Sequence, residues 1–331
     1  MFRTILRMPR FLMICACWLS MTSAHAAPEC IVPAKPGGGM DLTCKLTQKG
    51  LTTGAKPSDT SAPMRISYLP GGIGAVAWSS VISQRRAEAD TLVVFSSGSL
   101  LNLAQGKFGK ATPADVRWVA GVGTDYGMVA VRSDSPYKTL RDLVNAFKKD
   151  PAKVTIGTAG TIGSQDWIKV ALLAKQGGAD PKSLRFVAFE GGGESFTALL
   201  AGHVQAVSGD ASEASMVAGA GNPNGPIRVL AVLSDARLSG TLANVPTARE
   251  QGFDVSWPII RGVYMGPQVK DADYRKWVAA FDRMMATPAF DQMRIAHGLY
   301  PFSMTGEALT DFINKTVDNY GKQAKELGLV R

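Results

Sequence analysis

The chain contains few of the side chains that usually carry out catalysis or hold metal ions. Of its 331 residues, three are histidine and four are cysteine. It has no H-E-x-x-H motif, and the segment GESFT (193–197) ends in threonine where the G-x-S-x-G elbow of hydrolases needs a second glycine. His203 and His297, with the two cysteines beyond residue 26, have none of the standard spacings of a zinc site. We therefore expect no metal site and no enzyme activity.

Phosphate-binding motifs are missing or incomplete. The segment PGGGMDLTCK (36–45) lacks the lysine and hydroxyl residue of a Walker A loop. Gly72, Gly74 and Ala77 follow the dinucleotide pattern G-x-G-x-x-A, but Asp90 comes early for the carboxylate that binds the ribose. A tight turn with close helix packing is the alternative, and we expect no nucleotide cofactor.

Clustered positive charge is missing as well. The net charge is +9, yet adjacent basic residues occur at only three places, Arg85-Arg86, Lys148-Lys149 and Arg275-Lys276. A nucleic-acid interface needs a basic patch or stripe. The dispersed charge suits anionic small molecules or an acidic surface, so we expect no nucleic-acid partner.

No apolar run reaches the roughly 20 residues that a membrane-spanning helix needs. The run FLMICACWLSM (11–21) follows three arginines and precedes Ala24-His25-Ala26, the small-x-small pattern of a signal-peptidase site. Residues 1–26 are therefore predicted to be a cleavable signal peptide, because the run is too short for the alternative of a membrane anchor. Cleavage would remove three arginines and no acidic residue, lowering the net charge to +6. We expect an exported, periplasmic protein without a lipid anchor, since no lipobox is present.

Two cysteines remain after this segment, Cys30 and Cys44. In an oxidising compartment an isolated pair is typical of a disulfide. Such a bond would contribute roughly 3 kcal/mol on the loop-entropy model. Two free, buried thiols are the alternative.

Strand-like apolar runs alternate with helical patterns over the rest of the chain. MRISYLP (64–70) and VTIGTAG (154–160) predict strands, and LRDLVNAFKKD (140–150) has the apolar spacing of an amphipathic helix. VRWVAGVG (116–123) and YGMVAVRSD (126–134) are predicted as two further strands. The alternation favours an α/β fold with helices layered around largely parallel sheets.

Glycine-rich polar turns stand at several predicted strand-to-helix junctions, where ligands bind in open α/β sheets. The junctions are PGGGMD (36–41), PGGIG (70–74), FSSGS (95–99), GTAGTIGS (157–164) and EGGGES (190–195). Gly37–Gly39 and Thr158–Ser164 each open a predicted helix and bring backbone N–H groups to its positive end. Ordinary tight turns are the alternative for each. Two such sockets facing each other suit a ligand with carboxylates at both ends.

These motifs, in this order, resemble the solute receptors of tripartite tricarboxylate transporters, also called the Bug family. The likeness covers nearly the whole chain after residue 26. It is carried by PAKPGGGMDLTCKL (33–46), YLPGGIG (68–74), GTAGTIGS (157–164), VAFEGGGESFTALLAGHVQAVSGD (187–210), LAVLSDARLSGTLANVPTAREQGFDV (230–255) and WPIIRGVYMGP (257–267). Asp166-Trp167 and Arg261 depart from many members, as do the two cysteines. The pattern looks closest to receptors for citrate-like tricarboxylates.

The resemblance implies a type II periplasmic binding protein fold, in which two α/β lobes are joined by two crossover strands and hold the ligand in a central cleft. We place the crossovers near GMVAVRSD (127–134) and IRVLAVLS (227–234). Lobe 1 would then comprise residues 27–127 plus 233–331, and lobe 2 residues 128–232. Closure would be hinge bending, favoured by ligand contacts from both lobes.

The resemblance also implies the residues that hold the ligand. One carboxylate would bind the lobe 1 loop fixed by Asp41, and another would bind the first glycine-rich loop of lobe 2. The expected residues are Gly37, Gly38, Gly39, Asp41, Ser97 and Ser99 from lobe 1, and Thr158, Ala159, Gly160, Ser164 and Asp210 from lobe 2. Arg261 and Lys35 are added because a third carboxylate needs a cation, and an arginine fork matches a carboxylate. A surface salt bridge is the alternative for Arg261, and a solvated side chain for Lys35.

The sequence therefore predicts a receptor for a small di- or tricarboxylate that delivers its ligand to a tripartite tricarboxylate transporter. We expect it to act as a monomer with the membrane subunits of that transporter. An exported α/β enzyme acting on a carboxylate is one alternative, although no nucleophile–base pair supports it. A receptor that docks on a sensor kinase ectodomain is another.

Overall fold

The computed structural model describes residues 27–53, 63–217, 221–222, 224–326 and 328–330. The predicted signal peptide lies outside these residues. Within them, no helix combines the length and the apolar character needed to cross a membrane. The strands are β1 (Glu29–Val32), β2 (Arg65–Tyr68), β3 (Thr91–Ser96), β4 (Arg117–Arg132), β5 (Thr155–Ala159), β6 (Arg185–Phe189), β7 (Ala206–Asp210), β8 (Ile227–Leu233), β9 (Pro258–Met265) and β10 (Met304–Thr305). The helices are α1 (Gly39–Thr53), α2 (Ala75–Ser83), α3 (Ser97–Ala104), α4 (Leu140–Lys149), α5 (Gln165–Gln176), α6 (Gly192–Leu200), α7 (Ala211–Met216), α8 (Asp271–Met285), α9 (Pro288–Ala296) and α10 (Gly306–Glu326).

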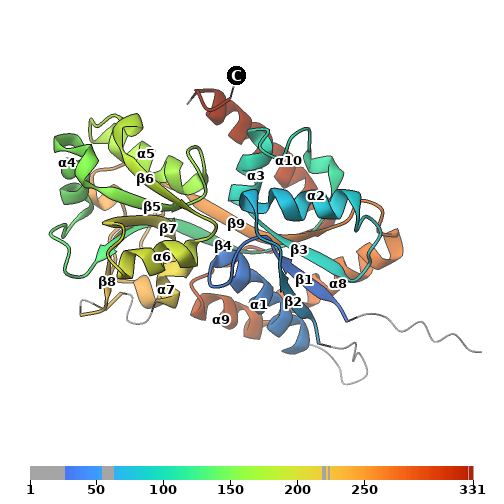
Figure 1. The fold of residues 1–331 in the computed structure, drawn as a ribbon. Coiled ribbons are helices and arrows are strands. Elements are labelled where there is room, and N and C mark those ends of the chain that lie inside the picture. Colours follow the sequence, from blue (N-terminus) through green and yellow to red (C-terminus); the bar gives the residue numbers. More distant parts are fainter. Residues whose placement is uncertain (1–26, 54–62, 218–220, 223, 327, 331) are drawn as a thin grey trace, which may run out of the picture.

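Lobe 1 is built on a sheet in the order β2-β1-β3-β9 (Figure 1). β1 is parallel to β2 and β3, whereas β9 runs antiparallel to β3. Successive residues of β3 point to opposite faces, as in any strand. Leu92 and Val94 pack with α1, α8 and α9, and Val93 and Phe95 pack with α2, α3 and α10. The sheet is therefore covered by helices on both faces.

Lobe 2 has a second sheet with helices on both faces. β5 is parallel to β6 and β7, and β4 is antiparallel to β7 and β8. α4 and α5 cover one face with side chains such as Phe147 and Trp167. α6 and α7 cover the other with Phe196 and Ala211. The α/β class that the alternation predicts is confirmed in both lobes.

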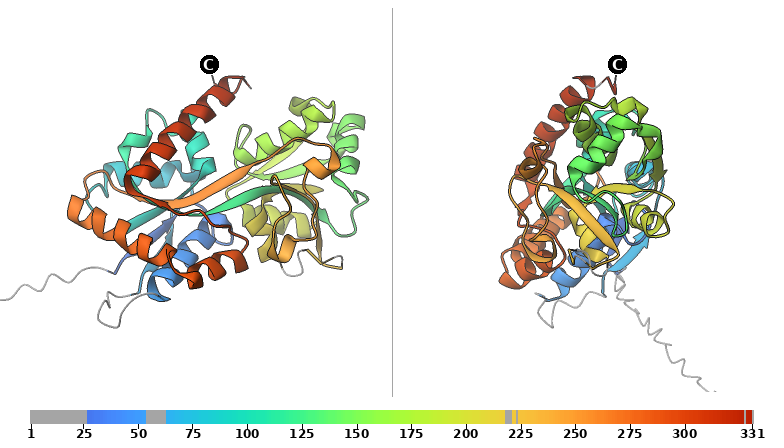
Figure 2. Two further views of the ribbon diagram at one scale, coloured as in Figure 1. Left: turned by 180° about the vertical axis from the view of Figure 1, so that it is seen from behind. Right: turned by 90° about the vertical axis from the view of Figure 1, so that its left-hand side faces the viewer.

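β4 passes from one lobe to the other as one strand of 16 residues, although the sequence predicts two strands here. It pairs with β9 as far as Tyr126 and with β7 and β8 from Gly127 onward (Figure 2). Asp125 lies between the two predicted strands, and its carboxylate is fully buried and accepts a hydrogen bond of 2.6 Å from the Ser212 hydroxyl. The polar residue is satisfied inside the fold, so the strand continues.

The second connection between the lobes differs from the predicted boundary at residue 233. Residues 234–257 pack against lobe 2, where Phe253 and Val255 join the core under α4 and α5. The Trp257 amide donates to the Leu233 carbonyl over 2.8 Å and holds the end of this segment beside β8. The segment has no long periodic pattern of apolar residues, so its sequence does not indicate which lobe it packs against. We therefore propose that lobe 2 extends to about residue 257, where β9 begins its path into lobe 1.

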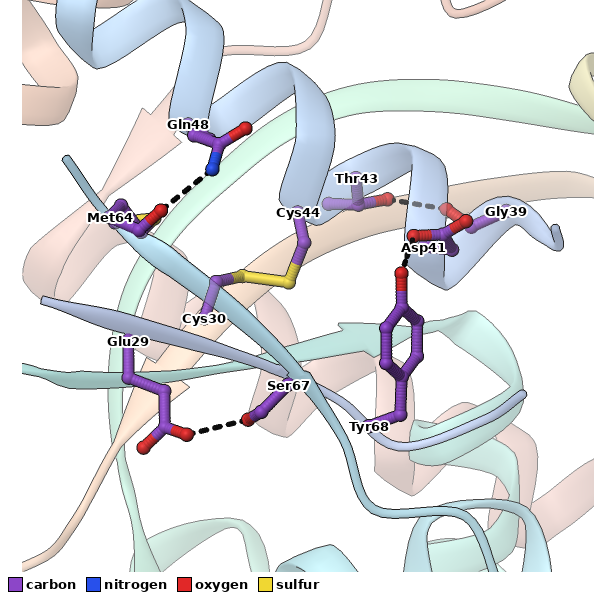
Figure 3. The surroundings of a disulfide bond; sticks show 10 residues. All are labelled: Glu29, Cys30, Gly39, Asp41, Thr43, Cys44, Gln48, Met64, Ser67 and Tyr68. Carbon is purple, nitrogen blue, oxygen red and sulfur yellow. Dashed lines mark hydrogen bonds between the residues drawn. A yellow bond between two sulfur atoms is a disulfide. The ribbon is translucent and has the colours of Figure 1, made fainter. Parts of the chain in front are cut away.

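The predicted disulfide is confirmed between Cys30 on β1 and Cys44 on α1 (Figure 3). Both residues are fully buried in the lobe 1 core. The bond joins the strand and the helix that flank the glycine loop, residues 33–38. It therefore fixes both ends of that loop.

Candidate ligand-binding site

A pocket lies between the two lobes, where β1, β3, β5, β6 and β7 end. This is the edge at which parallel sheets usually bind ligands. Six of the predicted ligand-binding residues line it: Gly38, Gly39, Ala159, Ser164, Asp210 and Arg261. The two lobes thus contribute opposite walls of one site.

The other predicted residues do not line this pocket, and Gly37 and Asp41 border a different hollow. Ser97 accepts a hydrogen bond from the Ile260 amide over 2.9 Å. Thr158 donates to the Gly160 carbonyl over 3.1 Å. Ser99 and Gly160 likewise bond to backbone groups of the protein, Ser96 and Phe189. In this structure these four residues stabilise backbone, and their contact with ligand stays a prediction.

The glycine loop of lobe 1 is held by Asp41. The Gly37 amide donates to Asp41 Oδ2 over 2.8 Å. The Tyr68 hydroxyl donates to Asp41 Oδ1 over 2.8 Å (Figure 3). Lys45 forms an ion pair with the same carboxylate at 2.7 Å. Gly37 has a φ of 89°, a left-handed conformation that glycine adopts without strain. The loop is therefore fixed by backbone conformation, by Asp41 and by the disulfide.

The positive end of α1 already has a carboxyl group beside it. The Gly39 amide donates over 3.0 Å to Glu213, which comes from α7 in lobe 2. The same side chain accepts from the Asp210 amide over 3.2 Å, as the third residue of a capping box. Burial raises the pKa of Glu213 to about 8, and the neighbouring carboxylates of Asp210 and Asp166 add to the rise. The predicted carboxylate-binding position at the start of α1 is thus occupied by Glu213, a side chain of the protein itself.

The glycine-rich loop of lobe 2 is satisfied in the same way. The Ala159 amide donates to Asp166 over 3.0 Å, and the Gly160 amide donates to the Phe189 carbonyl over 2.8 Å. The Ser164 hydroxyl caps α5 by accepting from the Trp167 amide over 3.3 Å. The glycine-rich loop is present at the start of α5, but acceptors within the protein already bind these N–H groups.

A buried charge network forms the floor of the pocket. Lys169 pairs with Asp166 and Asp210, each at 2.7 Å, and Arg261 pairs with Asp125 and Asp210, each at 2.6 Å. Burial opposes the charge of Lys169, but its two carboxylate partners outweigh that cost and raise its pKa. The same balance raises the pKa of Arg261, whereas Lys169 and Arg261 hold the pKa of Asp210 below its usual range against burial.

Arg261 joins the lobes through this network. It lies on β9 and is 1% exposed, so its ion pairs are not the surface salt bridge considered as an alternative. Asp125 is on β4 and Asp210 ends β7 in lobe 2. Arg261 borders the pocket while its charge is balanced by two carboxylates. Contact with a ligand stays a prediction.

Glycines allow the lobes to approach closely at the pocket mouth. A Cβ on Gly193 of lobe 2 would lie 2.8 Å from the Gly37 carbonyl oxygen of lobe 1. Such a distance excludes any side chain without movement of the neighbouring atoms. Lys35, for which we considered a solvated side chain, forms an ion pair of 2.6 Å with Glu194 beside this contact. The structure therefore has the two lobes closed against each other.

Comparison with known proteins identifies the family. The family model described as tripartite tricarboxylate transporter family receptor matches residues 91–329. The chain belongs to this family. The predicted family membership is thereby confirmed, and the chain is a solute-binding receptor of this type.

Two curated relatives of the receptor are UPF0065 proteins. One, from Cupriavidus necator, is 26% identical over 209 residues, which are 63% of this chain and 61% of that protein. The other, from Bordetella pertussis, is 23% identical over 323 residues, which are 94% of each chain. The receptor thus spans about three fifths of the first relative and nearly all of the second.

Three solved structures share the receptor's fold. The periplasmic binding protein BugD has a TM-score of 0.78 at 18% identity, covering 92% of this chain and 98% of its own. R. palustris Rpa4515, solved with adipate, has a TM-score of 0.78 at 19% identity, covering 91% and 97%. MatC from Rhodopseudomonas palustris, with bound malate, has a TM-score of 0.73 at 18% identity, covering 89% and 98%. These likenesses confirm the predicted periplasmic binding protein fold.

Several pocket residues of the receptor were missed from the sequence. Glu213 follows Asp210 at the spacing of a capping box, but nothing in that spacing shows that it reaches lobe 1. Asp166 stood out only as a departure from the family pattern. Glu190 and Gly192 belong to the junction EGGGES, which was noted without being assigned to the ligand. An acidic residue in each of three lobe 2 junctions was the available signal.

Proposed function

We propose that this protein is a periplasmic receptor that captures a small di- or tricarboxylate between its two lobes and delivers it to a tripartite tricarboxylate transporter. The observation that carries the proposal is the pocket at the strand ends, lined from both lobes. Family membership supports it, as do the adipate and malate in two proteins of the same fold. We expect export by the predicted signal peptide and action as a monomer on the transporter's membrane subunits.

Closure of the lobes would couple binding to delivery. Two connections join the lobes, along β4 and between β8 and β9. A ligand that touches both walls stabilises the closed form relative to the open one. A transporter subunit that contacts both lobes at once would then bind the closed, ligand-loaded receptor in preference to the open, empty one.

A thermal-shift screen of the purified mature protein against carboxylates tests the proposal. A ligand present at 100 times its dissociation constant should add roughly 2.7 kcal/mol to the free energy of unfolding. A shift with sugars or inorganic cations, and none with any carboxylate, would refute a carboxylate receptor.

The citrate-like refinement depends on Arg261. If this residue compensates a third carboxylate, Arg261→Ala should weaken citrate binding by more than it weakens binding of a dicarboxylate. The far-ultraviolet circular dichroism of the variant would verify that it folds, since Asp125 and Asp210 lose their partner. Equal losses for citrate and the dicarboxylate would remove the refinement and leave the carboxylate receptor in place.

A further inference from the structure

Glu213 joins the two lobes through a single carboxyl group. The side chain comes from α7 in lobe 2, and its Oε1 accepts a hydrogen bond from the Gly39 amide of lobe 1 over 3.0 Å. Its Oε2 accepts a hydrogen bond from the Asp210 amide of lobe 2 over 3.2 Å. The bond to Gly39 cannot persist when the lobes move apart, so it belongs to the closed arrangement alone.

Glycines of both lobes fit closely around this carboxyl group. A Cβ on Gly192 would lie 2.1 Å from Glu213 Oε2, and one on Gly209 would lie 3.1 Å from the same atom. On the lobe 1 side, a Cβ on Gly38 would lie 3.3 Å from Glu213 Oε1. Glu213 is 7% exposed within this enclosure. Because one wall of the enclosure belongs to lobe 1, the fit exists only while the lobes are closed.

Glu213 differs from the other acids of the buried network in having no ion pair. Each of the other three pairs with a buried lysine or arginine, whereas among the described residues Glu213 pairs with none. Lobe 1 faces it with the backbone of Gly38 and Gly39. The charged and titratable groups on the other surrounding elements are Asp125 on β4, Asp166 and Lys169 on α5, Glu190 after β6, Asp210 on β7 and Arg261 on β9. Acidic groups outnumber cations, so the uncharged form of Glu213 suits this place.

Protonation of Glu213 is coupled to closure. Burial raises the pKa of Glu213 to about 8 in the closed arrangement, and Asp210 and Asp166 add to the rise. Separation of the lobes removes one wall of the enclosure and admits water, which returns the pKa toward its ordinary value of 4.5. The contribution of this group to closure is therefore complete below about pH 4.5 and is lost as the pH rises through about 8.

We propose that Glu213 is a proton-operated latch between the lobes. With its proton, the side chain binds the start of α1 and favours the closed arrangement of the free receptor. Loss of the proton leaves an unpaired charge in the enclosure and favours the open arrangement, which admits a ligand to the pocket. A ligand group that takes the Gly39 amide must displace Glu213, so the latch and the ligand compete for one donor. The latch does not depend on which ligand the receptor captures.

Fluorescence energy transfer within the mature protein measures opening in the absence of ligand. Dyes on Ser79→Cys of α2 and on Lys182→Cys report the separation of lobe 1 from lobe 2, since both positions are exposed. The open-to-closed ratio of the parent should rise about tenfold or more from pH 5 to pH 8. A constant ratio over this range overturns the latch. It would leave the proposed receptor standing, because ligand binding plays no part in the measurement.

Two substitutions assign the effect to Glu213. Glu213→Gln keeps an acceptor for the Gly39 amide but cannot titrate, so its open-to-closed ratio should be the same at pH 5 and pH 8. Glu213→Ala lacks the latch and should be about tenfold more open than the parent at pH 5, the effect expected from one buried hydrogen bond. Circular dichroism verifies that both variants fold. A pH response retained in Glu213→Gln overturns the proposal and assigns the response to another group, such as Asp166, whose pKa burial raises to about 6.

Glu194→Ala is the matched control for contacts between the lobes. It removes the exposed ion pair of α6 with Lys35 of lobe 1. Exposed ion pairs contribute little, so the open-to-closed ratio should change by less than about threefold. Equal opening of Glu194→Ala and Glu213→Ala would overturn the specific role of Glu213.

Discussion

At the residue scale, the site depends on charges buried within a few ångströms of one another. Lys169 and Asp210 are both almost fully buried, and each is satisfied only because the other elements supply its partners. Isolated buried charges are costly, whereas well-bonded pairs are tolerated. The network therefore stabilises one arrangement of the pocket floor. A single substitution in it would leave a buried charge without its partner.

Removing Lys169 should be strongly destabilising. Lys169→Met leaves Asp166 and Asp210 buried without this cation, and we expect the free energy of unfolding to fall by about 3–5 kcal/mol. Urea unfolding followed by circular dichroism measures the loss. Lys175→Met, on the exposed side of the same helix, is the matched control and should change stability by less than about 0.5 kcal/mol. Similar losses in the two variants would contradict the role of the buried network.

Glu213 should make stability depend on pH. Its pKa is raised from 4.5 to about 8 in the folded protein, so the folded state retains a proton that the unfolded state releases. The stability from this group is complete below the unfolded pKa and is lost as pH rises between about 4.5 and 8. Glu213→Gln, which cannot titrate, should lose less stability over that interval than the parent. Urea midpoints at pH 5, 6, 7 and 8 give the comparison, and parallel pH profiles would refute it.

At this scale, the sequence predicted which residues lie at the site better than it predicted their hydrogen-bond and ion-pair partners. Gly38, Gly39 and Asp210 were expected at the site, and they do line the pocket. Glu213 was missed because its partner, the Gly39 amide, is 174 residues away in the chain. The fork of Arg261 was expected to face a ligand, and nothing in the sequence showed that Asp125 lies within its reach.

At the scale of secondary structure, local sequence patterns predicted some features of the fold and missed others. The disulfide between β1 and α1 followed from two isolated cysteines and the export signal. The continuity of β4 did not, because residues 116–123 and 126–134 were predicted as two separate strands. The packing of residues 234–257 could not be predicted either, since the two short 3₁₀ helices Gly240–Leu242 and Arg249–Gln251 give no periodic apolar face.

The disulfide should support the glycine loop. Replacing both Cys30 and Cys44 with alanine frees a loop that is closed over a separation of 14 residues, and we expect stability to fall by roughly 3 kcal/mol. Chemical unfolding of the double variant measures this loss. Reduction of the parent with dithiothreitol under partly denaturing conditions should produce a similar change. A double variant as stable as the parent would show that the bond adds nothing to the packing of β1 on α1.

At the scale of the whole molecule, two lobes meet at glycine-rich loops and a buried interlobe network. Gly193 approaches the Gly37 carbonyl, while Arg261 and Glu213 connect the lobes below. The fold class could be predicted from alternation and family resemblance. The closed arrangement could not, because it depends on contacts between loops that are over 150 residues apart.

A side chain at Gly193 should hinder closure. The Cβ of Gly193→Ala would lie 2.8 Å from the Gly37 carbonyl oxygen, so the lobes must remain further apart. We expect ligand affinity to fall about tenfold or more, equivalent to roughly 1.4 kcal/mol, without a loss of thermal stability in the free protein. Gly321→Ala is the control, since its Cβ would meet nothing within 4 Å. Unchanged affinity in Gly193→Ala would mean that binding does not need this contact.

The most direct test of the receptor is a crystal structure with the tightest-binding carboxylate from the thermal-shift screen. We predict one ligand molecule between the lobes, in the pocket lined by Gly38 and Gly39 from lobe 1 and by Ala159 and Ser164 from lobe 2. Density for the ligand outside this pocket, with the interlobe site empty at saturating concentration, would contradict the account.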